Sequence, residues 1–92
     1  MLVLRIKDGY DIKTLEGQTT VVVSSPDVQP LENTIFLTDT AVFLWNMLKA
    51  KDTVKSEMLN ALLENFDIST VLALGNIDQF LRTMKEYGII EE

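Results

Sequence analysis

The side chains that carry most enzyme chemistry are missing from this 92-residue chain. It contains no histidine and no cysteine, so the commonest general base, the commonest metal ligand and the thiolate nucleophile are all absent. A Ser-Lys pair is formally possible, but no motif supports one. The four glycines are isolated and form no phosphate-binding loop. The sequence therefore predicts a protein that is not an enzyme, with no catalytic residue, no cofactor and no metal site.

Carboxylates are the remaining groups with catalytic potential. Asp39 and Asp52 are expected at helix starts, and Glu57 and Glu64 on the polar side of a helix. A general acid needs surroundings that shift its pKa, which exposed carboxylates lack, so we interpret these four as a solvated surface. The net charge is −6 and no segment of the chain is basic, so binding to DNA or RNA lacks its usual electrostatic attraction.

Backbone groups offer a different kind of chemistry. Thr34–Leu37 is predicted to be a short strand, and an uncovered strand edge can receive an extended peptide as an additional strand. Each new hydrogen bond contributes only ~0.5–1.5 kcal/mol, so binding would also need side-chain pockets beside the edge. The groove between residues 34–37 and the third predicted helix could supply them. The alternative is an edge covered by the chain itself or by a dimer partner.

The elements that position this edge begin with a small antiparallel sheet. Period-two alternation and a run of valines predict strands over Tyr10–Leu15, Gln18–Ser24 and Thr34–Leu37. An apolar and basic alternation also runs through Met1–Lys7. Turns are predicted at Asp8-Gly9 and Glu16-Gly17. Both prolines lie in residues 25–33, which predicts a loop.

Three helices are predicted after the sheet. Thr38 and Thr53 are candidate N-caps of the first two, Ser69 or Asp67 of the third, and the first helix should end near Ala50. Each helix has an apolar stripe at helical spacing: Ala41, Leu44, Trp45 and Leu48; Val54, Met58, Ala61, Leu62 and Phe66; Leu74, Ile77, Leu81 and Met84, with Phe80 beside them. Trp45 is interpreted as a core anchor rather than a stacking platform for a ligand. Gly88 is the expected left-handed C-cap, with Ile89 folding back on the last turn.

A sheet followed by three short helices predicts an α+β, winged-helix-like domain, with residues 1–92 forming a single domain. The N-terminus has no apolar stretch of signal length. No window approaches the ~18 apolar residues of a membrane-spanning helix. We therefore expect a cytoplasmic protein with no membrane partner.

Two longer segments resemble a known family. Leu37–Leu48, LTDTAVFLWNML, is similar to the L-N-E-T-A-x-x-I-W-x-L-L segment of the coenzyme PQQ synthesis protein D family, and Ile77–Ile90, IDQFLRTMKEYGII, to that family's ending, V-x-x-F-L-x-x-L-x-x-x-G-L-I. Thr53-Val54, Leu62 and Phe66-Asp67 resemble its second helix. Thr38 stands where the family usually has Asn, which also caps a helix, and the common glycine after the first helix is missing.

The resemblance implies a recognition element for ribosomally made, post-translationally modified peptides. Such domains bind the leader segment of a precursor peptide and present it to a modifying enzyme, often a radical SAM enzyme. In the family the leader adds as a strand beside the third strand and against the third helix. Carried over, the implied binding residues are Thr34, Ile35, Phe36 and Leu37, with Ile77, Asp78, Leu81, Arg82 and Lys85 as candidate walls.

Other functions remain compatible with the fold. A winged-helix DNA-binding regulator would place the third helix in the major groove, although this helix carries only Arg82 and Lys85 as basic residues. A subunit that docks on a larger enzyme without binding a peptide is a third hypothesis. The sequence is also compatible with a homodimer.

Overall fold

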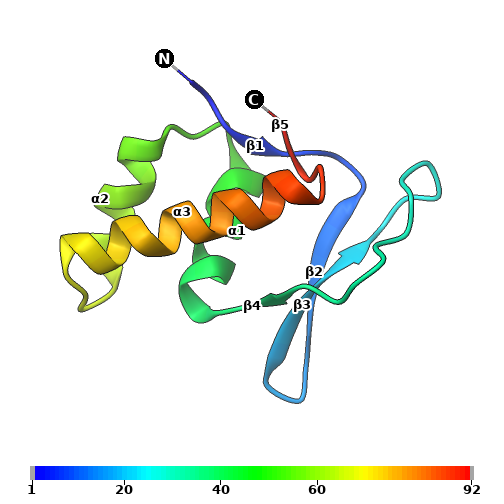
Figure 1. Cartoon of the computed structure of the whole chain (residues 1–92), viewed down its shortest axis with the longest axis horizontal. Helices are drawn as coiled ribbons and strands as arrows, with labels where there is room; N and C mark the ends of the chain where they lie inside the picture. The colour runs from blue at the N-terminus through cyan, green and yellow to red at the C-terminus, as the bar shows by residue number, and fades with distance from the viewer. Residues whose placement is uncertain (1, 92) are drawn as a thin grey trace.

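The computed structural model describes residues 2–91, so Met1 and Glu92 lie outside it. A three-stranded antiparallel sheet in the order β2-β3-β4 precedes three helices (Figure 1). The strands are β2 (Tyr10–Leu15), β3 (Gln18–Val23) and β4 (Phe36–Leu37), and the helices are α1 (Asp39–Ala50), α2 (Lys55–Asn65) and α3 (Thr70–Glu86). The predicted α+β arrangement is confirmed.

The hairpin of β2 and β3 is formed as the turn residues predict. Its register places Ile12 opposite Val21 and Leu15 opposite Gln18. Glu16 and Gly17 have φ values of 53° and 79°, and two successive positive φ angles are typical of the type I′ turn, whose twist matches that of the flanking strands. Just before β2, Gly9 has a φ of 97°, and a Cβ there would collide with Cγ2 of Val28.

The third strand of the sheet is shorter than predicted. Phe36 pairs with Thr20 and Leu37 with Thr19, and the Val21 N–H also donates to the Ile35 C=O at 3.1 Å. Leu37 leads directly into α1, where the Thr38 hydroxyl accepts from the Ala41 N–H at 3.3 Å. The predicted N-cap at Thr38 is confirmed, and it joins β4 to the helical half of the molecule.

A second strand pair links the two ends of the described chain. β1 (Arg5–Ile6) pairs antiparallel with β5 (Ile90–Glu91), and the sequence patterns did not predict this pairing. Gly88 has a φ of 67° and the Ile89 N–H donates to the Met84 C=O at 2.9 Å. This bond is the one expected of a Schellman motif, so the predicted C-cap of α3 is confirmed. It turns the chain back into β5.

The prediction that Thr53 caps the second helix is wrong. Thr53 is fully buried and donates its hydroxyl to the Lys51 C=O at 3.0 Å. Its backbone exchanges hydrogen bonds with Leu4 at 2.8 and 2.9 Å. Val54 is the N-cap residue of α2 and supplies no side-chain bond. The N-cap of α3 is Ser69, whose hydroxyl accepts from the Leu72 N–H at 3.2 Å.

One apolar core is shared by the sheet, the helices and the β1–β5 pair. Trp45 is 0% exposed, so the core anchor interpretation is confirmed. In α3 the predicted stripe is correct except at Leu74, which is exposed, whereas Ala73 is buried in the core.

Among residues 2–91, no helix is long and apolar enough to cross a membrane. The same residues contain no cluster of three or more acidic, histidine or cysteine side chains that could hold a metal ion.

Candidate functional site

The outer edge of β4 presents backbone groups to the surface. Residues of an antiparallel ladder alternate between exchanging hydrogen bonds with the partner strand and directing their N–H and C=O groups away from it. Because Ile35 accepts from Val21, the N–H and C=O of Phe36 point away from β3. β4 ends the sheet within the described residues. Phe36 therefore offers one donor and one acceptor to an added strand.

The side chains of this segment follow the same alternation. Ile35 is 5% exposed and belongs to the core, whereas Phe36 is 62% exposed. Leu37 is half-buried and packs against the core from its edge. A large apolar side chain left in solvent beside an uncovered strand edge is typical of a surface that binds another molecule.

A groove of about 190 Å³ lies between β4 and α3. Ile35, Phe36 and Leu37 line the strand side of the groove, and Thr38 and Ala41 line it at the start of α1. The α3 side consists of Asn76, Gln79, Phe80, Thr83 and Met84. The last four lie three, four, seven and eight residues after Asn76, so all five share one helix face.

The chemistry of this groove suits an uncharged or apolar segment. None of its lining side chains is ionisable. Phe36 supplies exposed apolar surface above a floor formed by the nearly buried Phe80 and Met84, while Asn76 and Gln79 carry amides that can both donate and accept. The groove can thus receive side chains from a strand laid along β4, and its amides can bond the polar groups of that strand.

The structure separates the nine predicted binding residues into three groups: four in or beside β4, two buried on α3, and three charged residues on another face of α3. Thr34, Ile35, Phe36 and Leu37 form or adjoin the β4 edge. Ile77 is fully buried in the core and Leu81 is 8% exposed, so both hold α3 in place. Thr34 is exposed and lies in a separate hollow at the end of the loop before β4.

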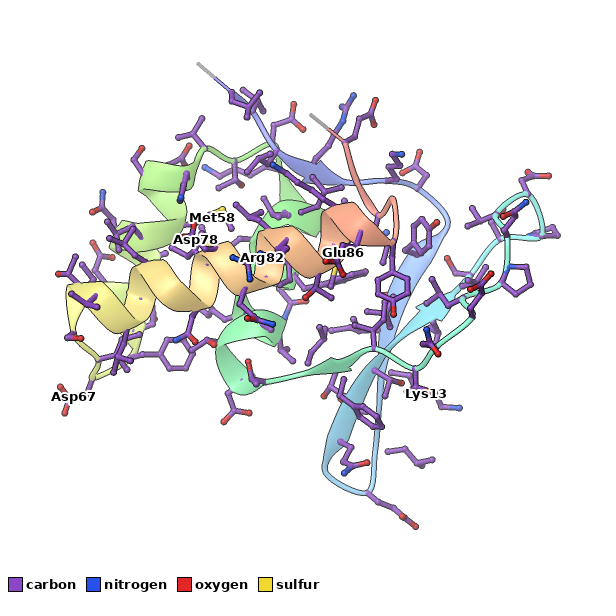
Figure 2. All side chains as sticks on the ribbon, viewed as in Figure 1. Lys13, Met58, Asp67, Asp78, Arg82 and Glu86 are labelled. Carbon is purple, nitrogen blue, oxygen red and sulfur yellow. The ribbon has the colours of Figure 1, made fainter. Side chains whose placement is uncertain are left out.

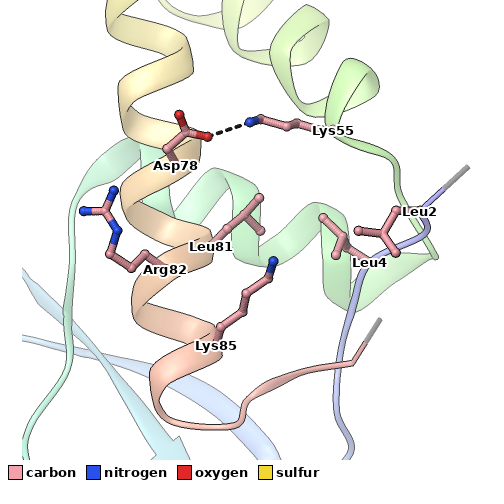
Figure 3. Close-up of a pocket in the computed structure, with 7 residues that line it drawn as sticks. All are labelled: Leu2, Leu4, Lys55, Asp78, Leu81, Arg82 and Lys85. Atoms are coloured by element: carbon pink, nitrogen blue, oxygen red, sulfur yellow. Dashed lines mark hydrogen bonds and ion pairs between the residues drawn. The ribbon is translucent and has the colours of Figure 1, made fainter.

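The three charged residues among the predicted binding residues lie on the other face of α3, together with Leu81. Asp78, Leu81, Arg82 and Lys85 line a second groove of about 480 Å³ with Leu2, Leu4 and Lys55 (Figure 3). The four α3 residues of this groove are also three or four positions apart, but they lie on a different face of the helix from the residues that face β4. We therefore name two surfaces: the strand groove, beside β4, and the basic groove, beside Leu2 and Leu4. Peptide binding by any of these residues stays a prediction.

The residues of α3 that face β4 were missed in the sequence. Asn76, Gln79 and Thr83 are neutral polar residues at helical spacing beside the apolar stripe. That pattern could have indicated the helix face beside β4. The predicted groove walls instead followed the family resemblance and favoured charged residues. Only the orientation of α3 relative to β4 distinguishes the two helix faces.

The chain belongs to a known family. The family model of coenzyme PQQ synthesis protein D matches residues 13–90, which includes all three strands of the sheet except the start of β2, and all three helices. The predicted family resemblance is thereby confirmed. Among curated proteins, no match was found.

A solved structure has the same fold. It is described as "TbiB1 in Complex with the TbiA(beta) Leader Peptide". Its TM-score is 0.69 at 13% sequence identity, and the match covers 95% of this chain and 94% of that chain. At this identity the likeness establishes the fold, and the leader peptide is a ligand of that protein.

Proposed function

We propose that this protein is a peptide-binding adaptor that captures the leader segment of a ribosomally made precursor peptide by strand addition at β4. The free N–H and C=O of Phe36 beside the strand groove are the observation that carries the proposal. Family membership and the leader peptide bound to TbiB1 support it. In this proposal the bound leader lies between β4 and the Asn76, Gln79 and Thr83 face of α3.

The energetics assign most of the affinity to side chains. Two backbone hydrogen bonds at Phe36 contribute about 1–3 kcal/mol together, whereas micromolar binding requires about 8 kcal/mol. Burying an apolar side chain contributes about 1.5–3 kcal/mol, so two or three leader side chains packed on Phe36, Phe80 and Met84 would supply the difference. The backbone edge then sets the register, and the strand groove selects the sequence.

The adaptor carries out no reaction in this proposal. A chain without histidine or cysteine holds the substrate peptide, and a separate modifying enzyme, such as the radical SAM enzymes that often serve in this family, performs the chemistry. The core shared by both halves of the chain supports the interpretation of residues 1–92 as a single domain, and a cytoplasmic location remains part of the proposal. The net charge of −6 gives the DNA-binding alternative no electrostatic support.

An NMR titration tests the proposal. The probe is a synthetic leader segment of a precursor encoded beside the gene for this chain. At saturation we expect chemical-shift changes at the amides of residues 34–37 and at Gln79 and Thr83. Lys55 and Asp78 in the basic groove serve as the internal control and should change little. Saturable binding without any change along residues 34–37 would overturn the strand-addition site.

A further inference from the structure

A hollow of about 370 Å³ lies beyond one end of the strand groove. β4 and α3 run in opposite directions (Figure 1), so the residues before Ile35 and those after Met84 lie at the same end of that groove. These two segments continue into the hollow, which is lined by residues 29–32, Glu86, Tyr87 and Tyr10. A leader strand that extends past Ile35 therefore reaches this hollow.

The charge of this hollow is negative. Glu32 and Glu86 are its charged side chains, and none of the basic side chains that the structure describes lines it. Within residues 2–91 the ion pairs are made by other carboxylates, so neither glutamate is neutralised by a contact there. Glu86 is also the last residue of α3, where the helix dipole adds partial negative charge. We name this surface the acidic hollow.

Basic residues on the neighbouring elements face other surfaces. Arg82 lies one turn before Glu86 on α3 (Figure 2) and lines the basic groove together with Lys85. Lys49 donates from its ammonium group to the Tyr10 C=O at 2.7 Å, at the outer edge of β2. The two carboxylates of the acidic hollow can therefore attract a cationic partner.

Tyr10 supplies an unpartnered hydroxyl to the acidic hollow. The residue is 8% exposed, and its hydroxyl makes no hydrogen bond with any residue from 2 to 91. The fully buried side-chain polar atoms that lack a partner in this range do not include the Tyr10 oxygen, so it reaches solvent where Tyr10 lines the hollow. A phenol oxygen can accept from a guanidinium or an ammonium group, and the ring faces of Tyr10 and Tyr87 attract cations.

We propose that the acidic hollow binds a lysine or arginine side chain of the leader, while the adjoining leader residues lie along β4. This inference rests on the proposed adaptor function and adds a charge requirement to it. The cation is a side chain rather than a metal ion, because Ca²⁺ takes about six to eight oxygen ligands and the carboxylates that line the hollow are those of Glu32 and Glu86.

Distances along the chain place this basic residue within the leader. Glu32 precedes Phe36 by four positions, and Glu86 follows Gln79 by seven, which is roughly 10 Å along a helix. An extended strand covers that distance in about three residues. The basic residue should therefore lie about three or four positions from the leader residue that bonds Phe36.

Two synthetic peptides test the charge requirement by isothermal titration calorimetry. One is the leader segment of the precursor encoded beside the gene for this chain. The other carries the neutral counterpart of its basic residue, citrulline for arginine or acetyl-lysine for lysine. The neutral peptide should bind about three- to tenfold more weakly, because it loses its attraction to both carboxylates. Raising the salt concentration from 50 to 500 mM should reduce this difference, since the Debye length falls severalfold.

Matched variants distinguish the hollow from the overall charge. E86Q should weaken the unmodified leader segment about two- to fivefold. E64Q makes the same change at an exposed position near the C-terminal end of α2 and should change binding by less than about twofold. Y10F keeps the buried ring and removes the hydroxyl, so it should weaken binding about twofold and leave the Tm unchanged. Circular dichroism verifies that all three variants fold, and equal effects of E86Q and E64Q would overturn the proposal.

Combining peptide and protein changes separates this inference from the proposed function. In the E32Q/E86Q variant the two peptides should bind with affinities within about twofold of each other, because the charge of each partner acts through the other. If the leader segment does not bind at all, the adaptor function fails and this inference fails with it. If it binds along β4 but has no basic residue at the expected position, or binds equally well in its neutral form, the charge requirement alone is overturned. Displacement of the leader by millimolar calcium chloride would reassign the hollow to a metal ion.

Discussion

The two edges of the three-stranded sheet differ in how their outward backbone groups are satisfied. On β2, the Tyr10 C=O accepts from the Lys49 ammonium at 2.7 Å, and the Ile12 N–H donates to its neighbour Asp11 at 2.9 Å. Charged side chains such as Lys13 line this edge, which is a usual protection against added strands. On β4, Phe36 directs both groups outward beside an apolar groove. The longer edge is thus protected at Tyr10 and Ile12, and the edge of two residues is available.

This difference shows that edge length alone does not identify a binding strand. β2 has six residues and β4 has two. Both residues of β4 line the groove formed with α3, whereas in the part of the chain that the structure describes β2 reaches a hollow beside α3 only at Tyr10. An isolated edge supplies a few weak hydrogen bonds, whereas an edge beside a groove adds side-chain burial. The following predictions test this comparison, beginning with the largest expected effect.

Replacing the isoleucine at each edge with alanine should lower the free energy of unfolding more at β4 than at β2. Ile35 is buried and Ile12 is only half-buried, and the two lie opposite Val21 on the chain segments that flank β3. We expect I35A to lower the free energy of unfolding by about 2–4 kcal/mol and I12A by about 1–2 kcal/mol, because the cost grows with the cavity left behind. Urea denaturation measures both. I35A should also weaken leader binding, and equal stability losses would contradict the different anchoring of the two edges.

Proline substitutions remove one outward N–H from each edge without removing a ladder bond. F36P should weaken leader binding by about 1–2 kcal/mol more than F36A does, roughly five- to thirtyfold, since the leader carbonyl loses its donor. T14P makes the matching change on β2, where Thr14 lies opposite Thr19 in a pair that directs its N–H outward, although it also loses a 2.7 Å hydroxyl contact.

T14P should leave leader affinity within about twofold of the original. F36A, which keeps the N–H and removes the ring, measures the side-chain share separately. Isothermal titration calorimetry gives the affinities of all three variants. If T14P weakens the leader as much as F36P does, the strand adds to both edges and the comparison fails.

The smallest effect is expected from the lysine that protects β2. K49M removes the donor to the Tyr10 C=O and leaves water in its place, which should cost about 0.5–1.5 kcal/mol of unfolding free energy. Leader affinity should not change, because the Lys49 contact lies on the other edge. Thermal denaturation and calorimetry measure the two quantities. A clear loss of leader affinity in K49M would place part of the binding surface on β2.

Local patterns predicted most of the fold correctly. The hairpin at Glu16-Gly17, the N-caps at Thr38 and Ser69 and the C-cap at Gly88 depend on nearby residues, and all four are present in the structure. Thr53 failed as a cap because a contact with Leu4, distant in sequence, fixes its backbone. The β1–β5 pair was missed because its strands are also distant in sequence. Each has only two residues, which is too short for a periodic pattern to show the pairing.

The candidate site was predicted in part. The segment 34–37 could be predicted because its residues favour a strand, and because a loop with two prolines precedes it and a helix N-cap follows it. The matching face of α3 could not, because Asp78, Arg82 and Lys85 have the same helical spacing as Asn76, Gln79 and Thr83. Choosing between these faces requires the rotation of α3 about its axis, which is set by packing of residues such as Ala73 and Ile77 in the core.

The most direct test of the account is amide hydrogen exchange at the two edges, followed by NMR with and without the leader segment. Without leader, the N–H groups of Phe36 and Thr14 should both exchange rapidly, because both point outward from the sheet. At saturating leader, exchange at Phe36 should slow by at least about tenfold, while exchange at Thr14 should be unchanged. Bound leader that leaves Phe36 unprotected, or that protects Thr14 equally, would contradict strand addition at β4.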